Sequence, residues 1–283
     1  MRTQSIDTTP EIERIQIARI RSFSPARKFA SVRSWTRTLT SANLRAMHNS
    51  NVETNERDIA IRFVTREYGE RLAADLQANL HSRSDWTIQA PDLLAALVPV
   101  IEVFGRLGVK YALSGSVACS IYGFPRGVQD IDLVADLRDE YISSFVANMQ
   151  HDYTLNDSDL HNAMQQKTIF NLLHANTLMK VDIFLAKNDY SFDSIVFERA
   201  QQHPLVEGFY PFWIAAPEDV ALHSLMWYKA GGAVADDQWN DILGLFKVQA
   251  LVLDLAYLQQ QATLLQVAGL FAQALVDADI SQT

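Results

Sequence analysis

The sequence has few of the residues that mark secreted, fibrous or flexible proteins. One cysteine, Cys119, occurs in 283 residues, which excludes an intramolecular disulfide and favours a reducing compartment. Eleven glycines and eight prolines are too few for a long flexible linker. No run reaches the roughly 18 apolar residues of a membrane span, since Asp92, Pro99 and Glu102 interrupt the most apolar stretch, residues 90–105. We therefore expect a soluble, cytoplasmic protein without a membrane partner.

Charge is distributed unevenly along the chain, whose net charge is −9. Residues 1–90 carry 14 Lys and Arg against 10 Asp and Glu, whereas residues 91–283 carry 10 against 23. Such asymmetry indicates separate folding units or an arm that meets a polyanion. A basic arm favours RNA, with binding that falls steeply with salt. Its amphipathic stripe equally fits a partner protein or a homodimer formed through the N-terminal helices.

The hydrophobic pattern divides the chain into three parts. Residues 1–85 lack strand-like alternation and predict a helical arm, with helices over residues 10–48 and 56–80. Residues 86–215 alternate short strands with helices. Residues 216–283 predict only helices, over residues 217–230, 237–248, 254–265 and 266–276. The expected fold class is α+β, a mixed sheet flanked by helices with a helical N-terminal arm and a helical C-terminal segment.

In the central part, the order of elements follows from apolar runs and turn residues. A helix that ends at Gly108 precedes the first strand. Strands are expected over residues 110–114, 130–135, 167–173 and 178–185, the last two as a hairpin around residues 174–177. Helices are expected over residues 117–122, 139–149 and 192–201. We assign Asp157 and Asp159 to a polar loop.

Three carboxylates stand in apolar strand settings, where an unpaired charge is costly. Asp130 and Asp132 alternate with Ile131 and Leu133, so both carboxylates point to one face of the strand. Asp182 sits in a second apolar strand, either facing water at an edge or beside the pair. Clustered carboxylates raise one another's pKa unless a cation lies between them. Oxygen ligands of this kind suit Mg²⁺ or Mn²⁺.

The segment before this pair supplies features that suit an anion. Gly115-Ser116 lies between a strand and a helix, where backbone N–H groups and the helix N-terminus can face a phosphate. Arg126, in the connecting turn, either reaches phosphate or stays at the surface.

These motifs resemble the nucleotidyltransferase fold of the DNA polymerase β superfamily, and more narrowly its small prokaryotic minimal and abortive-infection members. The resemblance spans about residues 90–275 and includes the tail segments Pro217-Glu218-Asp219, Trp227-Tyr228-Lys229 and Asp237–Leu243. It implies that Gly115 and Ser116 bind a nucleoside triphosphate such as ATP. It also implies that Asp130, Asp132 and Asp182 hold Mg²⁺ or Mn²⁺, and that Asp182 helps to deprotonate the acceptor. Residues 60–76 are similar to small helical proteins encoded beside such transferases.

Some assignments stay open at this point. Lys229 either contacts phosphates, pairs with Asp241, or is an ordinary helix-end lysine that interacts with the helix dipole. Val128 stands where the family often has threonine. The expected function is transfer of a nucleoside monophosphate to a hydroxyl of a protein, a tRNA or a small molecule. The alternative is a catalytically degenerate module of a toxin–antitoxin-like system that binds a nucleotide or a partner.

Overall fold

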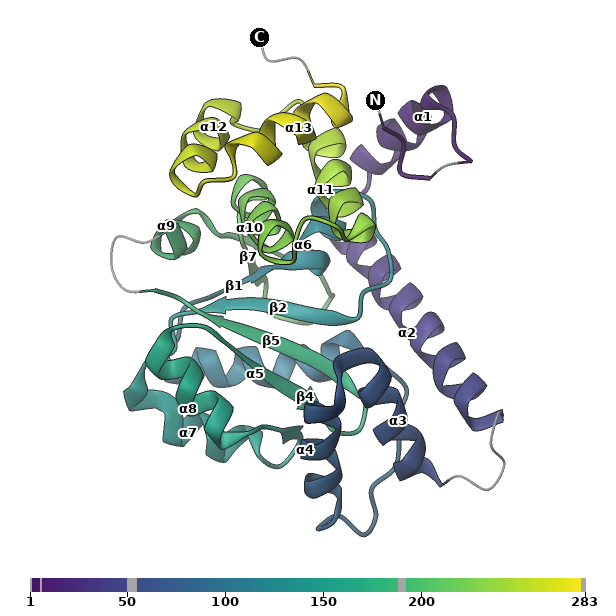
Figure 1. Ribbon diagram of the computed structural model, residues 1–283, viewed down its shortest axis with the longest axis vertical. Coiled ribbons are helices and arrows are strands. Elements are labelled where there is room, and N and C mark those ends of the chain that lie inside the picture. The colour runs from purple at the N-terminus through teal and green to yellow at the C-terminus, as the bar shows by residue number, and fades with distance from the viewer. Residues whose placement is uncertain (1, 6, 50–54, 188–191, 281–283) are drawn as a thin grey trace. The chain divides into compact units, whose positions relative to one another are not determined.

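The computed structural model describes residues 2–5, 7–49, 55–187 and 192–280. The chain folds into two compact units, each built from segments that are distant in sequence (Figure 1). The first unit comprises Met1–Val32, Leu113–Arg126 and Glu198–Thr283, and the second Arg33–Ala112 and Gly127–Phe197. Each unit contains segments from more than one of the three parts predicted from the sequence. The division of the chain at residues 85 and 215 stays a prediction.

The second unit is built on strands β2 and β5, which pair in parallel. β5 also pairs antiparallel with β4, and β4 with β3, so the strand order is β3-β4-β5-β2. These strands are β2 (Asp130–Ala135), β3 (Tyr153–Thr154), β4 (Ile169–His174) and β5 (Met179–Leu185). The helices are α3 (Glu56–Tyr68), α4 (Glu70–Leu80), α5 (Leu93–Leu107), the 3-10 helix η1 (Asp139–Tyr141), α7 (Ile142–Met149), α8 (Asp157–Gln166) and most of α9 (Phe192–Arg199).

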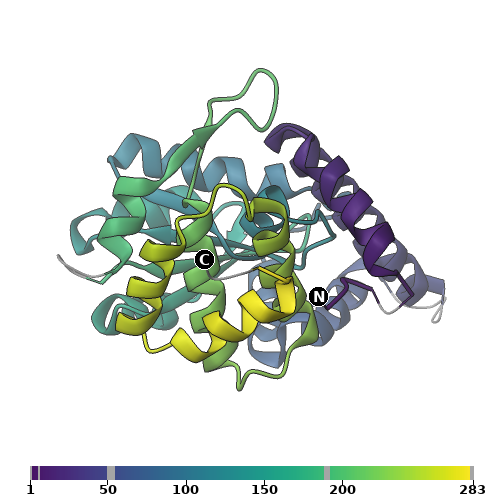
Figure 2. The same cartoon turned by 90° about the horizontal axis from the view of Figure 1, so that it is seen from above.

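The first unit is mainly helical. β1 (Tyr111–Ser114) pairs in parallel with β7 (Phe212–Ile214), which pairs antiparallel with β6 (Gln201–His203). Figure 2 shows the chain between β6 and β7 projecting from the unit, and Tyr210 there is 89% exposed. The helices are α1 (Pro10–Arg21), α6 (Gly115–Tyr122), α10 (Pro217–Ala230), α11 (Asp236–Gln249), α12 (Leu255–Leu264) and α13 (Ala268–Ala278).

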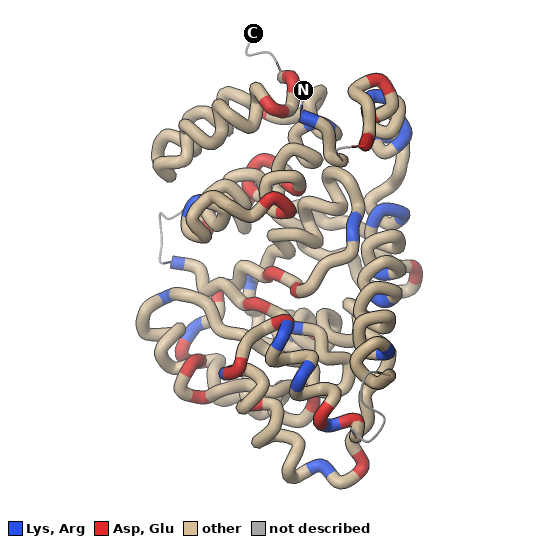
Figure 3. Tube along the Cα trace, turned by 45° about the vertical axis from the view of Figure 1, so that its right-hand side comes forward, with Lys and Arg blue, Asp and Glu red and all other residues tan. Residues whose placement is uncertain are grey.

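The long helix α2 (Pro25–Asn49) begins in the first unit and continues into the second. Its sequence contains no Asp or Glu, and Figure 3 shows Lys and Arg spaced along it. Arg33 on this helix forms an ion pair with Asp92, the residue whose carboxylate caps α5. None of the helices in the described part of the chain is long and apolar enough to cross a membrane.

The predicted α+β class is confirmed, because mixed strand pairs are flanked by helices and the described residues before 85 contain helices only. The predicted hairpin of β4 and β5 is also confirmed. α10 has the predicted bounds. The helix that starts at Leu93 ends at Gly108, which adopts a left-handed φ of +71°.

Three sequence predictions about elements are wrong, and three short strands were missed. The single helix predicted over residues 56–80 is two helices, because Gly69 takes a φ of +95° between α3 and α4. Asp157 and Asp159 lie in the first turn of α8 rather than in a loop, since Asn156 caps that helix. The helix predicted to reach Gln201 ends at Arg199. The short strands β3, β6 and β7 were not predicted, because two or three residues carry too little alternation.

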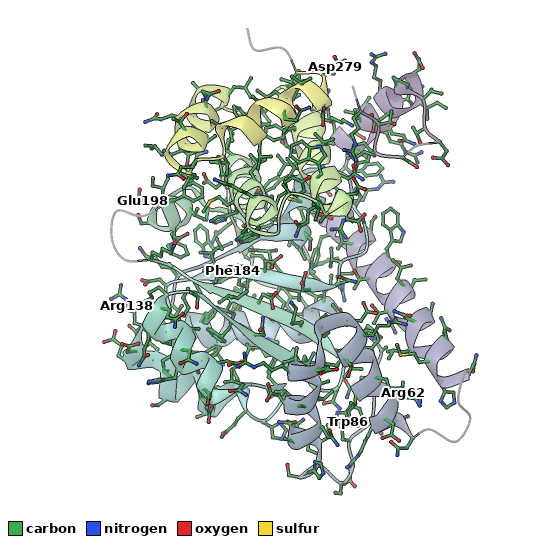
Figure 4. The ribbon with its side chains drawn as sticks, viewed as in Figure 1. Arg62, Trp86, Arg138, Phe184, Glu198 and Asp279 are labelled. Carbon is green, nitrogen blue, oxygen red and sulfur yellow. The ribbon has the colours of Figure 1, made fainter. Side chains whose placement is uncertain are left out.

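Helices α3 and α4 are an integral part of the second unit. Their apolar stripe, including Phe63 and Leu76, packs in one buried cluster with Trp86 and with Leu173 and Leu178 from the β4–β5 region. Figure 4 shows Trp86 beside these two helices. The indole Nε1 of Trp86 donates to the carbonyl oxygen of Ala175 at 3.1 Å. This packing places part of the N-terminal helical segment against the β4–β5 hairpin, which carries Asp182.

Candidate active site

The paired strands β2 and β5 place the three predicted carboxylates on one face. Asp132 is in register with Asp182, and Asp130 with Lys180. Because side chains alternate along a strand and neighbouring residues in register share a face, these four side chains project together. The intervening residues Ile131, Leu133, Val181 and Ile183 are fully buried. The structure thus places Asp130, Asp132 and Asp182 on one face of two neighbouring strands, and their role as a site stays a prediction.

An ammonium group lies between two of these carboxylates. Lys180 Nζ is 2.7 Å from Asp182 Oδ2 and 3.2 Å from Asp130 Oδ2. Asn171 on β4 is in register with Asp182 on β5, and its Nδ2 donates to Asp182 Oδ1 at 2.7 Å. Both oxygens of the buried Asp182 carboxylate therefore accept a hydrogen bond.

The electrostatics of this cluster are a balance between burial and pairing. Burial raises the pKa of Asp182 above its ordinary value, although Lys180 acts in the opposite direction. Burial disfavours the charged form of Lys180, but Asp182 and Asp130 outweigh it and raise the lysine pKa. The lysine thus stays charged and neutralises part of the cluster.

Tyr68, at the end of α3, covers one side of this cluster. Its hydroxyl donates to the carbonyl oxygens of Gln129 at 2.9 Å and Leu178 at 3.2 Å. Lys180 Nζ lies 5.5 Å from the centre of the tyrosine ring. Burial, with Asp130 and Asp182 nearby, raises the pKa of Tyr68 well above its ordinary value. The phenol is therefore a neutral group whose hydroxyl serves to hold α3 on the strands.

Among the described residues, there is no group of three or more His, Cys, Asp or Glu side chains that could hold a metal ion as they stand. The cation between Asp130 and Asp182 is the ammonium of Lys180 instead. The chemistry of the donor set still fits Mg²⁺ or Mn²⁺, because it consists of carboxylate oxygens in a largely apolar setting. A ligand role of Asp130, Asp132 and Asp182 stays a prediction, and it requires Lys180 to give up its contacts.

Gly115 and Ser116, in the first unit, have the predicted strand–glycine–helix setting. β1 leads directly into α6, which begins at Gly115, two residues before the predicted start. Gly115 has a φ of +56°, a conformation that favours glycine. The hydroxyl of Ser116 is buried and has no hydrogen-bond partner among the described residues. An unpartnered hydroxyl at a helix N-terminus suits an anion, and the phosphate role of both residues stays a prediction.

Arg126 is committed to a carboxylate. Its Nε and Nη2 donate to the two oxygens of Asp241 on α11 at 2.6 and 2.5 Å. Asp241 is therefore the partner of Arg126 and not of Lys229. Lys229 instead donates from Nζ to the carbonyl oxygen of Gln266 at 2.9 Å, in the last turn of α10. Lys229 thus does not pair with Asp241, and a phosphate contact by this lysine stays a prediction.

Replacing Arg126 tests whether the guanidinium serves to hold α11. Arg126→Met is expected to lower the free energy of unfolding by about 2 kcal/mol, because it leaves the mostly buried Asp241 without its partner. Adding Asp241→Leu should recover most of this loss, which urea denaturation would measure. Arg37→Met, at an exposed position of α2, is the control. A double variant as unstable as Arg126→Met would contradict the structural role.

Three residues of the site were missed by the sequence analysis. Lys180 could have been predicted from the sequence, because side chains alternate along β5 and residues 180 and 182 therefore share a face. Asn171 and Tyr68 could not, since only the β4–β5 pairing and the packing of α3 bring them close. Val128, where the family often has threonine, donates its backbone N–H to Thr36 Oγ1 on α2 at 3.0 Å. The Thr36 hydroxyl thus contacts the backbone at this position.

Comparisons with known proteins give structural neighbours only. No family model and no curated protein matches the sequence. The chain is similar to an antigenic nucleotidyltransferase-like protein from Paracoccidioides brasiliensis, at 17% identity over 65% of this chain and 92% of that chain, with a TM-score of 0.39. It is similar to ANT(2″)-Ia in complex with adenylyl-2″-tobramycin, at 8% identity over 61% and 96%, with a TM-score of 0.41. A solution structure of the antibiotic-resistance factor ANT(2″)-Ia gives 12% identity over 60% and 94%, with a TM-score of 0.38. These three structures are a nucleotidyltransferase-like protein and two structures of ANT(2″)-Ia.

Proposed function

We propose that this protein is a metal-dependent nucleotidyltransferase that moves a nucleoside monophosphate from a nucleoside triphosphate to an acceptor hydroxyl. One observation carries the proposal: Asp130, Asp132 and Asp182 project from one face of two parallel strands whose other face is buried. A chain gains nothing for stability by gathering three carboxylates there, because like charges in a partly buried site repel one another. Lys180 supplies one positive charge to this cluster, and a bound metal ion would supply the remainder.

The reaction balances without any further reagent. The acceptor oxygen forms a bond to the α-phosphorus, the bond from that phosphorus to the β-bridging oxygen breaks, and pyrophosphate leaves with the electron pair. Asp182 would help to remove the hydroxyl proton, which passes to solvent. A bound Mg²⁺ would neutralise the charge of the triphosphate and of the leaving pyrophosphate.

The chain's own residues would divide the remaining work. Asp130, Asp132 and Asp182 would hold the metal. Gly115 and Ser116 would bind phosphate oxygens through backbone N–H groups and the unpartnered serine hydroxyl. In the absence of metal, Lys180 would reduce the repulsion between the carboxylates of Asp130 and Asp182.

The test is a labelling assay with the full-length protein. Each α-³²P-labelled nucleoside triphosphate is incubated with the protein, Mg²⁺ and a cell extract. The expected result is a labelled acceptor and an equal amount of pyrophosphate, both abolished by EDTA. Absence of label with all four nucleotides, from a protein shown to be folded by circular dichroism, would overturn the proposal.

A degenerate nucleotide-binding module is the second candidate, and one observation favours it. Lys180 already neutralises part of the carboxylate cluster, as a site without metal would require. Calorimetry with ATP separates the two candidates. ATP binding that is independent of Mg²⁺, together with no labelled product, would favour the module of a toxin–antitoxin-like system.

A further inference from the structure

A small polar pocket lies within the second unit beside the carboxylate cluster. Its volume is about 140 Å³. Half of its lining comes from the end of α3 and from α4, and the other half comes from α8 with its cap and from β4 and β5: Tyr68, Arg71, Leu72, Asp75, Asn156, Asp159, Asn171 and Lys180. The N-terminal helical segment thus forms one wall, opposite residues of the α/β part.

The pocket and the carboxylate cluster share two residues. Lys180 and Asn171 line the pocket, and each of them also donates a hydrogen bond of 2.7 Å to Asp182. A group held in the pocket is therefore separated from the Asp182 carboxylate by no more than one side chain. The pocket is thus next to a residue of the proposed catalytic site.

The charges around the pocket favour a cation over an anion. Arg71 pairs with Asp159. Asp75 accepts a hydrogen bond from Asn156 Nδ2 at 2.9 Å, but none of the described Lys and Arg side chains forms an ion pair with it. The lining contains two carboxylates, Asp75 and Asp159, and two cationic groups, Arg71 and Lys180, of which Arg71 pairs with Asp159 and Lys180 with the carboxylate cluster. Asp75 is thus the lining carboxylate that would attract an ammonium group of a ligand.

The size of the pocket limits what can enter. Sites for drug-sized ligands measure roughly 300–1,000 Å³, so this pocket holds a fragment of a few non-hydrogen atoms. Leu72 is its one aliphatic lining residue, and the remainder are hydrogen-bonding groups. The occupant is thus a small polar group, either a whole small molecule or the end of a larger one.

We propose that this pocket binds the acceptor of the transfer reaction, and that the acceptor carries an amine close to the hydroxyl that receives the nucleotide. Asp75 pairs with the ammonium, and the hydroxyl lies toward Lys180 and Asn171. The acceptor role rests on the proposed function, whereas the binding of a cationic hydroxyl compound can be measured without it.

The first experiment measures binding in the full-length protein. Leucine methyl groups are labelled with ¹³C, and ethanolamine is titrated while the Leu72 methyl signals are followed by NMR. We expect a saturable shift, an affinity weakened by about threefold or more in Asp75→Asn, and no effect of Asp58→Asn on the exposed face of α3. Glycerol phosphate should leave the Leu72 signals unchanged. No shift with ethanolamine, or an equal shift with glycerol phosphate, would overturn the proposal.

The second experiment measures transfer. Leu72→Trp, which fills the pocket, should lower labelling of the acceptor in a cell extract by about tenfold or more while calorimetric ATP binding is unchanged. Labelling as strong as that of the wild type would show that the pocket is not the acceptor site, and would leave the proposed function intact. A wild-type protein that labels nothing would overturn the proposed function and with it the acceptor role, while the NMR titration still decides whether the pocket binds a cationic hydroxyl compound.

Discussion

Asp182→Asn is expected to reduce nucleotidyl transfer on the order of 10²–10³-fold. The substitution keeps the size and shape of the side chain and removes its charge. Asp182 is the most enclosed of the three carboxylates, with 6% of its surface exposed, so solvent offers little compensation. The neutral amide would hold a metal ion and its phosphate ligands much less well than the carboxylate does.

The measurement compares initial rates with a labelled nucleoside triphosphate at saturating Mg²⁺. Asp157→Asn, at an exposed position in the first turn of α8, is the matched control and should transfer at the wild-type rate. Melting temperatures of both variants separate loss of chemistry from loss of fold. A well-folded Asp182→Asn protein that transfers as fast as the wild type would remove Asp182 from the site.

Lys180→Met is expected to make the stability of the protein depend on divalent cations. In the absence of such ions, the variant leaves Asp130 and Asp182 without the ammonium group that lies between them. Removing one partner of a buried ion pair lowers the free energy of unfolding by about 3–5 kcal/mol. Because Asp130 is partly exposed, we expect Lys180→Met to lower it by about 3 kcal/mol. The melting temperature should fall by several degrees.

Adding Mg²⁺ should raise the melting temperature of Lys180→Met more than that of the wild type. The reason is that the ion and the lysine ammonium need the same carboxylate oxygens, so the wild-type protein must break its ion pairs to bind the metal. Thermal unfolding with and without Mg²⁺ measures this difference, with the exposed Lys110→Met as control. Equal stabilisation of the two proteins by Mg²⁺ would show that the lysine and the ion do not compete.

Combining Lys180→Met with Asp182→Asn supplies an internal check. The double variant has one carboxylate fewer and should recover part of the stability that Lys180→Met loses in the absence of Mg²⁺. It should also show the smallest response to Mg²⁺. A double variant that is less stable than either single variant would mean that these side chains act mainly through packing.

Local patterns in the sequence were sufficient for most of the central elements. The strand Asp130–Ala135 and the hairpin of β4 and β5 were predicted because each combines apolar alternation with adjacent turn residues. The same reasoning failed at Gly69 and at Asn156. Each is one residue that acts through its own backbone or cap, the first breaking a helix and the second starting one.

The candidate site was only partly predictable for a different reason. Asp130, Asp132 and Asp182 can be identified as candidate site residues from the sequence, because each lies in an apolar run where an unpaired buried charge is costly. The residues that contact these carboxylates cannot be predicted in the same way. Tyr68 reaches them through the packing of α3, and Asn171 through the antiparallel register of β4 and β5.

By itself, the sequence determined that this is an α+β protein with a carboxylate pair on one strand and a third carboxylate on another. Those features follow from residue type and spacing, which act over a few positions. Only the tertiary structure decided that Lys180 lies between the carboxylates, that Arg126 belongs to Asp241, and that α4 forms the wall of a pocket. The contacts of Lys180 with Asp130, of Arg126 with Asp241 and of α4 with the β4–β5 hairpin join residues far apart in the chain, and only the fold decides which opposite charge comes within reach of a charged side chain.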